Sequence, residues 1–168
     1  SLPDRPSIAV LPFQNMSGDP EQEYFVDGMT DAITTELGKV SGFDKVSAWQ
    51  SMRVYKKTTM SLGEIAREVD VDALVQGVVL REGNRVRISS KLFRISPEKQ
   101  LWANSYDREL REVLSLQSEV AQAIIGVLSR RRHKELNDAS FVKSRDLDPI
   151  DTWNATKVGQ HRGQRVNA

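Results

Sequence analysis

Three carboxylates, Glu23, Asp27 and Asp31, recur at intervals of four residues in the first third of the chain. In a helix this spacing places all three on one side, and paired carboxylates are groups that general acid–base catalysis uses. An apolar row that begins at Phe25 is offset from them by two residues, so it points roughly the opposite way. Because an acid–base pair needs a concave, partly dry site, we interpret the acidic row as a solvent-facing surface, with docking of a partner protein as the alternative.

Residue types suited to nucleophilic or metal chemistry are scarce. The chain has no Cys and only two His, His133 and His161, which both lie in polar stretches near its end. The lack of Cys excludes a disulfide framework, a thiolate metal site and a Cys nucleophile. Structural metal centres usually need four ligands from Cys, His and carboxylates. We therefore expect no catalytic residue, no metal and no cofactor.

A polar loop at residues 15–19 follows the apolar run 8–13 and leads into a helix start at Pro20. Ligands often bind at such places in open α/β sheets. The loop lacks the glycine pattern and the Gly-Lys-Ser/Thr of phosphate-binding loops, and Asp19 puts a carboxylate where an anion would bind. We interpret Asp19 as a helix cap and keep Asn15, Ser17 and Asp19 as candidate contacts for a small molecule or a peptide.

Two basic groups raise the question of nucleic acid, although the formal charge of the whole chain is only +1. Residues 130–134 fit the basic end of a helix, where the helix dipole favours cations. The other group, between Arg81 and Arg94, fits the wet face of an exposed strand. Phe93 is the one aromatic residue within this group, and a single ring does not form an interleaved platform on which successive bases stack. We therefore expect no direct contact with nucleic acid.

Two aromatic residues, Trp49 and Tyr55, lie between an expected strand at 45–48 and an expected helix at 61–69. They either pack the domain or form part of a groove. We keep both as candidate contacts for a ligand or a partner.

The hydrophobic periodicity predicts the element order β-α-β-α-β-β-β-α. Ser61 and Glu64 form a capping-box pattern, and Gly83-Asn84 is a hairpin signal. The order indicates an α/β domain with a mixed sheet and helices on its faces. The expected strands are 8–13, 45–48, 73–80, 86–92 and 100–106, and the expected helices are 20–42, 61–69 and 109–132.

Charge and hydropathy change along the chain. Residues 1–128 carry 15 Lys and Arg against 18 Asp and Glu, a net charge of −3, whereas residues 129–168 carry 9 against 5, a net charge of +4. Large apolar residues also become rare after Leu128. We therefore expect a linker end at 1–6, a folded domain at 7–134 and a polar tail at 135–168. No apolar run of the chain is long enough for a membrane helix. The chain opens at Ser1 without Met, so we interpret it as a fragment of a longer protein.

The motifs SIAVLPF (7–13), NMSGDPEQEYF (15–25) and DGMT (27–30) resemble the opening of the TolB amino-terminal-domain-like family. Further matches follow in the same order, and together they cover about residues 7–128. They lie at 55–56, 65–68, 71–77, 83–88, 101–103, 106–110 and 116–121. The resemblance implies a three-layer α/β/α domain with a mixed five-stranded sheet.

Relatives of this type sit inside longer bacterial proteins, next to an output module and tetratricopeptide repeats. The output module is a winged-helix DNA-binding domain, a class III nucleotide cyclase or a protein kinase. Trp153 and Gly159 resemble the start of the first such repeat. A membrane helix often precedes the domain, so the resemblance implies a location on the periplasmic or extracytoplasmic side of the membrane. The cytoplasm is the alternative. The domain would contact the membrane only through the parent protein.

These observations favour a non-catalytic sensing or protein-interaction module of a larger bacterial regulatory protein. Its expected partners are other domains of the parent chain, other proteins and a small-molecule ligand. The alternative is a structural spacer or cell-envelope adaptor without a ligand of its own. An enzyme would need a nucleophile–base pair or a metal constellation, and the sequence contains neither pattern.

Overall fold

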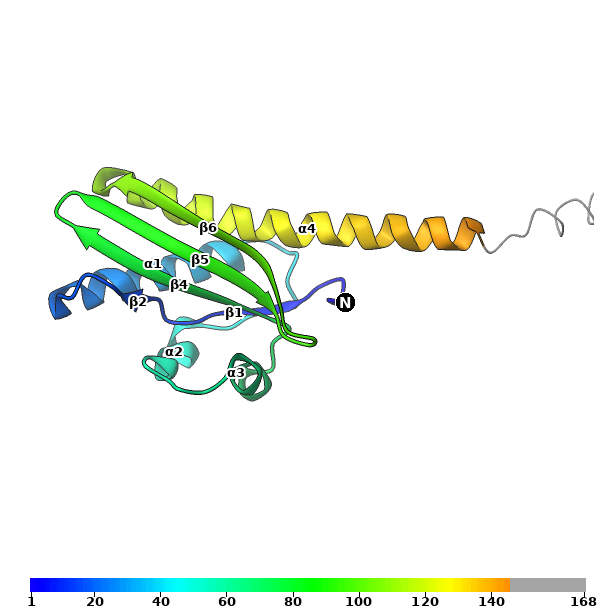
Figure 1. Ribbon diagram of the computed structural model, residues 1–168, viewed down its shortest axis with the longest axis horizontal. Coiled ribbons are helices and arrows are strands. Elements are labelled where there is room, and N and C mark those ends of the chain that lie inside the picture. Colours follow the sequence, from blue (N-terminus) through cyan, green and yellow to red (C-terminus); the bar gives the residue numbers. More distant parts are fainter. Residues whose placement is uncertain (146–168) are drawn as a thin grey trace, which may run out of the picture. The chain divides into compact units, whose positions relative to one another are not determined.

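The computed structural model describes residues 1–145, which form a mixed β-sheet with helices on both faces (Figure 1). Short 3₁₀ turns at Pro20–Gln22, Arg53–Tyr55 and Leu110–Glu112 connect several of the elements. The strands are β1 (Ser7–Val10), β2 (Gln14–Asn15), β3 (Lys45–Val46), β4 (Ala73–Glu82), β5 (Arg85–Arg94) and β6 (Lys99–Glu109). The helices are α1 (Glu23–Gly38), α2 (Trp49–Met52), α3 (Leu62–Val69) and α4 (Val113–Arg145).

The sheet has the strand order β3-β1-β4-β5-β6, in which β1 is parallel to both β3 and β4, and β5 and β6 are antiparallel. This confirms the expected mixed sheet, although a sixth strand joins its path of five. A further short strand, β2, pairs with β4 beyond the end of β1. The chain leaves β4 between β1 and β2 because Pro12 has no N–H to donate. The next N–H, that of Phe13, donates to Thr30 Oγ1 on α1 at 3.0 Å instead.

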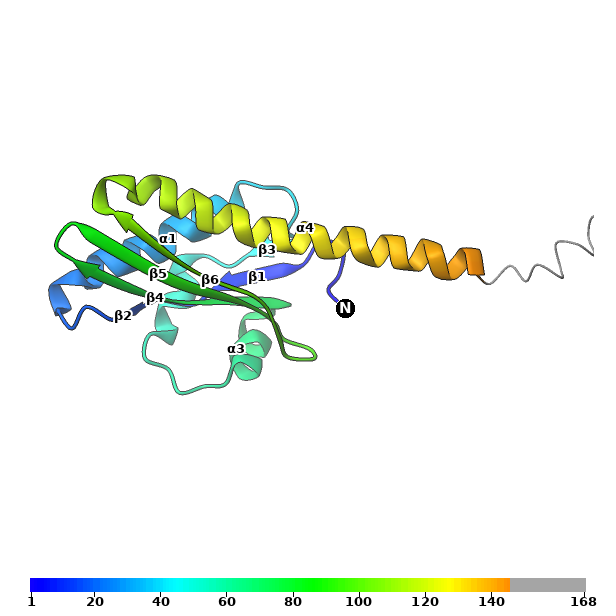
Figure 2. The same cartoon turned by 45° about the horizontal axis from the view of Figure 1, so that its top comes forward.

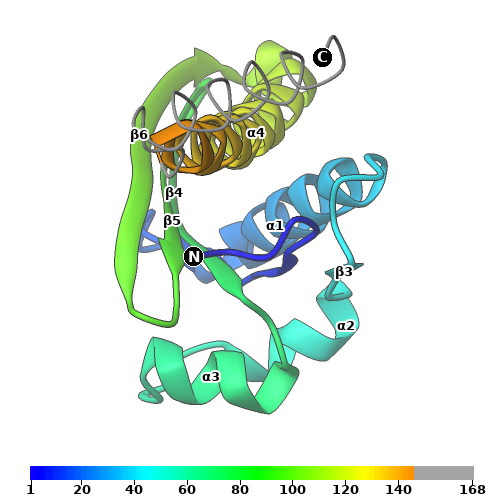
Figure 3. The same ribbon diagram turned by 90° about the vertical axis from the view of Figure 1, so that its right-hand side faces the viewer.

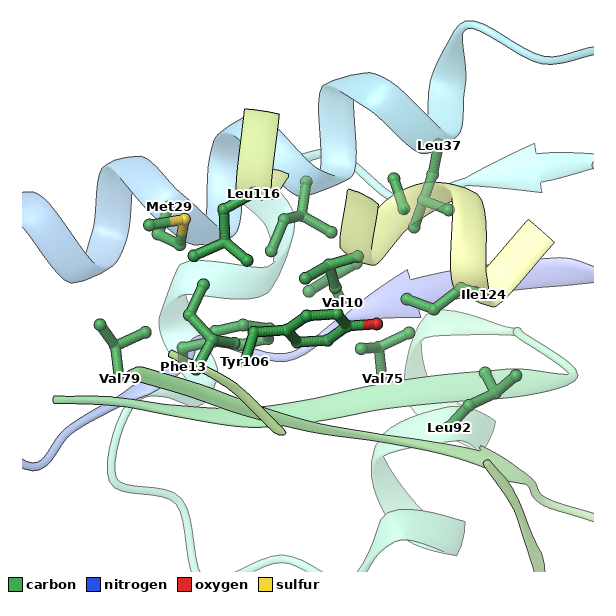
Figure 4. Packing of buried hydrophobic residues seen from close by; sticks show 14 of the residues in the cluster. Val10, Phe13, Met29, Leu37, Val75, Val79, Leu92, Tyr106, Leu116 and Ile124 are labelled. Atoms are coloured by element: carbon green, nitrogen blue, oxygen red, sulfur yellow. The ribbon is translucent and has the colours of Figure 1, made fainter. Parts of the chain in front are cut away.

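One face of the sheet packs against α1 and the first part of α4. Met29 and Leu37 of α1 and Leu116 and Ile124 of α4 point at the sheet, where the ring of Tyr106 lies among them (Figure 4). The apolar row that the sequence predicts on α1 is therefore confirmed. Burial of these side chains is the main source of the domain's stability.

The other face carries a smaller layer built from α2 and α3 (Figures 2 and 3). Residues of β1 alternate between the two faces, as strand geometry requires: Ile8 belongs to the larger core, whereas Ala9 packs with Met52 and Ile65. Helices therefore cover both faces, and the expected three-layer α/β/α architecture is confirmed.

Local sequence signals account for several element boundaries. Ser61 Oγ accepts the Glu64 N–H, and the Glu64 side chain accepts the Ser61 N–H, so the expected capping box opens α3. Gly83 has φ +55° in the β4–β5 hairpin, a conformation that glycine adopts freely. Asp19 Oδ1 accepts the Glu21 N–H at 3.0 Å, which confirms the expected helix cap.

The end of the last helix differs from the prediction. The expected helix ended at Arg132, but α4 continues through the basic residues 130–134 to Arg145. Residues 129–145 contain neither Gly nor Pro, so nothing in the local sequence stops the helix. The interpretation of this basic group as a helix C-terminus is therefore wrong. Within residues 1–145, no helix is both long and apolar enough to cross a bilayer.

Candidate functional site

The polar loop at residues 15–19 is closed by its own hydrogen bonds. Asn15 Nδ2 donates to the Asp19 carbonyl oxygen at 2.8 Å and to Glu23 Oε1 at 3.2 Å, and Asn15 Oδ1 accepts the Ser17 N–H at 2.9 Å. Ser17 Oγ accepts the Arg81 N–H of β4 at 3.1 Å. These bonds give Asn15, Ser17 and Asp19 a structural task, which is to join the end of β2 to the start of α1. Their role as ligand contacts stays a prediction.

The sequence predicted that the whole acidic row faces solvent. Two of its members, Glu23 and Asp27, do not lie on an open surface. Lys56 Nζ lies 2.9 Å from Asp27 Oδ2 and 3.1 Å from Glu23 Oε2, and both carboxylates are half-buried. The hydrogen bond from Lys56 lowers the pKa of Glu23, and the bond to Asp27 raises the pKa of Lys56. Of the three carboxylates, only Asp31 is classed as exposed. Glu23 and Asp27 therefore attach the segment after α2 to α1. The periodicity of the helix sequence cannot reveal such a contact.

Trp49 and Tyr55 take different places. Trp49 begins α2 and is half-buried, whereas Tyr55 is buried in the smaller core beside Met52 and Ile65. Burial raises the pKa of Tyr55, and the neighbouring Glu68 carboxylate adds to the effect. Its phenol therefore stays protonated at neutral pH. Tyr55 lines a pocket, and Trp49 does not.

That pocket, called the sheet pocket below, lies between the α2/α3 face of the sheet and the segment 55–65. Its volume is about 380 Å³, within the range of small-molecule sites. The floor comes from the β1–β2 connection and from the middle of β4 and β5. Of the five candidate contact residues, only Tyr55 lines it. Apolar side chains supply much of the wall: Leu11, Pro12, Met60, Leu62, Ile65 and Val78.

The break between β1 and β2 helps to form this pocket. Leu11, Pro12 and Gln14 line it where the chain leaves β4. On β4 the position opposite the break is Gly77, and a Cβ there would lie 2.6 Å from the Phe13 ring. The Phe13 ring thus packs into the larger core against Gly77. On the opposite face of the sheet, the break between β1 and β2 forms part of the sheet pocket.

Two lysines, Lys57 and Lys91, give the sheet pocket its charge. Lys57 belongs to the covering segment and Lys91 to β5, so they come from opposite walls. Both side chains are exposed, and neither takes part in an ion pair among the described residues. The Lys57 charge does contribute, after Lys56, to the lowered pKa of Glu23. Lys57 also has φ +58°, a left-handed conformation that costs a non-glycine residue about 1 kcal/mol. Strain of this kind is frequent at functional sites.

The chemistry that this arrangement supports is binding. The residues that line the sheet pocket include no carboxylate, His or Cys, so a general base or a nucleophile of those kinds is absent there. Hydrogen-bonding groups come from Tyr55 and from four uncharged polar residues, Gln14, Thr58, Gln76 and Ser89. In the described part of the chain, no group of three or more His, Cys, Asp and Glu is placed to hold a metal ion.

The basic group on the β4–β5 hairpin is partly neutralised. Arg85 lies 2.6 Å from Asp107 Oδ1 and Arg87 lies 3.3 Å from Asp107 Oδ2, and the hydrogen bond from Arg85, followed by that from Arg87, lowers the pKa of Asp107. Arg81 lies over the Phe25 ring, 5.0 Å from its centroid. Arg85 and Arg87 of β5 lie on the wet face, as expected. Arg81 of β4 lies instead on the side of the sheet that α1 covers, so its assignment to the wet face is wrong.

Sequence reasoning selected Tyr55 but missed the lysines and the pocket itself. The assignment of Lys91 to the solvent-facing side of its strand is correct. The sequence did not show that the segment 55–65 lies over part of that side. The left-handed turn at Lys57 has no signal in the sequence, because Gly and Asn are the usual markers of that conformation.

No protein-family model matches the chain. A protein of Rhizobium meliloti (strain 1021), named "Putative adenylate cyclase 3", is 46% identical over 127 residues. The match takes in 76% of this chain but only 22% of the longer protein. The chain thus spans about a fifth of the length of this relative.

Solved structures share the fold at low sequence identity. TolB from Acinetobacter baumannii superimposes with a TM-score of 0.54 and 16% identity, over 76% of this chain and 29% of TolB. This chain has a TolB amino-terminal-like fold. A DUF330 protein from Xanthomonas campestris has a TM-score of 0.55 at 7% identity, over 79% of this chain and 92% of its own. A PelC variant from Paraburkholderia phytofirmans, solved as a dodecamer, has a TM-score of 0.51 at 16% identity, over 76% and 92% of the two chains.

Proposed function

We propose that this chain is a non-catalytic sensing domain of a larger bacterial protein whose output is a nucleotide cyclase. The observation that carries the proposal is the 46% identity to a segment that makes up only 22% of a cyclase-named protein. Such a segment leaves most of that protein for its other domains. The TolB-like fold and a pocket lined by no carboxylate, His or Cys support a binding role.

In this proposal the domain acts by preferring one conformation of the parent protein when its ligand or partner is bound. We also propose tetratricopeptide repeats after the domain. Residues 153 and 159, which resemble the start of the first repeat, lie outside the described residues. The extracytoplasmic location is likewise proposed, on the resemblance alone. Winged-helix or kinase outputs are the other possibilities that the resemblance leaves open.

The first test asks whether the chain itself is catalytic. The 168-residue chain is incubated with ATP and Mg²⁺, and cyclic AMP is measured against a buffer blank and against the full-length Rhizobium meliloti relative. We expect cyclic AMP from the relative alone. Formation of cyclic AMP by the isolated chain would overturn the non-catalytic assignment, and an inactive relative would overturn the cyclase output.

The second test separates a sensing domain from a spacer. The matching segment of the relative is replaced either by residues 7–128 of this chain or by an unrelated folded domain of similar size. We expect the graft to keep the native cyclase rate and the unrelated domain to change it. An unchanged rate with the unrelated domain would favour the structural spacer, because only length and bulk would then matter.

A further inference from the structure

We propose that the sheet pocket binds a small organic anion with an apolar body, such as a medium-chain carboxylate. This deepens the function proposed above by naming the chemical class of ligand. Binding to the isolated chain is nevertheless independent of any cyclase output, so the two proposals fail separately.

The charge argument rests on the two lysines. Lys57 and Lys91 reach the pocket from opposite walls, and no carboxylate lines it. Elsewhere in the domain several cations have an acidic partner: Lys56 has Glu23 and Asp27, and Arg85 has Asp107. A ligand that carries the missing negative charge would complete the site in the same way.

The apolar argument rests on the walls. Leu11, Tyr55 and Ile65 are buried and line the pocket from the side of the smaller core. Val78 contributes a half-buried apolar surface from β4. A fully hydrated inorganic ion would leave these surfaces without a partner, whereas an amphiphile would cover them and place its charge at the lysines.

The backbone at Lys57 is an independent observation. Its φ of +58° is unusual for a side-chain-bearing residue, and the turn is closed by a hydrogen bond from the Thr58 N–H to the Tyr55 carbonyl oxygen at 3.2 Å. The neighbouring Lys56 fixes this turn to α1 through its two carboxylate partners. The backbone of Lys57, from which its side chain extends, is therefore fixed in position by the fold.

The test uses the fluorescent anion 8-anilinonaphthalene-1-sulfonate and its uncharged analogue N-phenyl-1-naphthylamine, each titrated into the full 168-residue chain. We expect saturable binding of the anion that weakens at high salt and competition by decanoate. Lys57→Gln and Lys91→Gln should each weaken it about fivefold, the effect of one partly exposed charge pair. The matched control is Lys99→Gln, a lysine on β6 that does not line the pocket.

A second variant tests the shape. Val78→Phe places a larger apolar side chain in the pocket on a strand that favours aromatic residues. We expect it to abolish binding of the anion while the thermal unfolding midpoint stays that of the wild type. Equal affinity in all three lysine variants, equal loss in Lys99→Gln, or undiminished binding by Val78→Phe would each overturn the proposal. Binding of both probes with no effect of the lysines would reduce the site to an uncharged apolar pocket and also contradict it.

Discussion

At the residue scale, Gly77 and Phe13 show how a single missing side chain shapes the domain. Phe13 is 2% exposed, and its ring atoms would lie 2.6–2.7 Å from a Cβ at position 77. Real Cβ atoms do not approach a ring so closely, and the ring is enclosed by the larger core. Gly77 is therefore required for close approach, although glycine generally weakens a strand.

We predict that Gly77→Ala lowers the free energy of unfolding by about 1–3 kcal/mol, the usual effect of overpacking a core. Urea unfolding monitored by circular dichroism measures it. The control is Gly28→Ala in α1, where an added Cβ meets nothing within 4 Å; alanine should stabilise this helix position by up to about 1 kcal/mol. In the double variant Gly77→Ala with Phe13→Leu, the loss in free energy of unfolding should be smaller than the sum of the losses in the two single variants. Strict additivity would contradict the steric explanation.

The ion pair at Glu23 leads to a pH prediction. Lys56 lowers the pKa of Glu23 below the ordinary 4.5. The pair's contribution is therefore fully present above that ordinary pKa and is lost as the pH falls through the lower, folded-state pKa. Because the Glu23 side chain is 38% exposed, the contribution should stay below about 1 kcal/mol.

Glu23→Gln keeps the shape of the side chain but removes its charge. We predict that the wild type is more stable than this variant at pH 7 and that the difference shrinks toward pH 3, as measured by urea unfolding at each pH. Glu21→Gln, an exposed residue two positions earlier, is the control and should show no such convergence. Parallel pH profiles for wild type and Glu23→Gln would show that the ion pair adds nothing in solution.

Residue roles were predictable from the sequence where the physics is local. The Asp19 cap and the Ser61–Glu64 capping box need only a few consecutive residues. The bond from Lys56 to Asp27 joins positions 29 residues apart, and the pocket joins Tyr55 to Lys91. Such contacts depend on how the segment 55–65 lies over the sheet, which no local pattern encodes.

At the element scale, α4 shows which part of a long helix holds the domain together. Its first half places Leu116, Val120 and Ile124 in the larger core. Residues 129–139 are mostly exposed. The periodic apolar row of the first half was predicted, whereas the continuation to Arg145 was not, because composition alone suggested an end at the basic residues.

Two leucines in the first turns of α4 offer a matched test of this packing. Leu116 is 1% exposed and Leu114 is 74% exposed. We predict that Leu116→Ala lowers the free energy of unfolding by about 2–5 kcal/mol, because it leaves a cavity between α4 and the sheet. Leu114→Ala should change it by less than about 0.5 kcal/mol. Similar losses in both variants, measured by chemical denaturation, would contradict the assignment of the buried face.

At the scale of the whole molecule, the two helical layers differ in size and in task. The larger layer of α1 and α4 supplies most of the buried apolar side chains, whereas the smaller layer of α2 and α3 encloses fewer and leaves the sheet pocket beside it. The larger core and the proposed binding pocket thus lie on opposite faces of one sheet. Substitutions that line the pocket can therefore alter binding while the larger core stays intact.

The extent of the folded domain can be tested by truncation, since the expected boundary near Lys134 stays a prediction. Among residues 113–139, the part of α4 whose burial the structure describes, the last buried side chains are Ile124 and Val127. We predict that a chain that ends at Lys134 keeps the unfolding midpoint of the full chain within about 2 °C, because every residue described as buried is retained.

A chain that ends at Glu119 is the control, because it loses Val120, Ala121, Ile124 and Val127 from the core. It should show no cooperative transition in a thermal scan, since removing four buried side chains exceeds the stability of a typical small domain. If the chain that ends at Lys134 also melts far below the full chain, residues beyond 134 contribute to the folded unit. The basic residues 130–134 would then lie inside the domain, and the change of charge along the sequence would not mark its end.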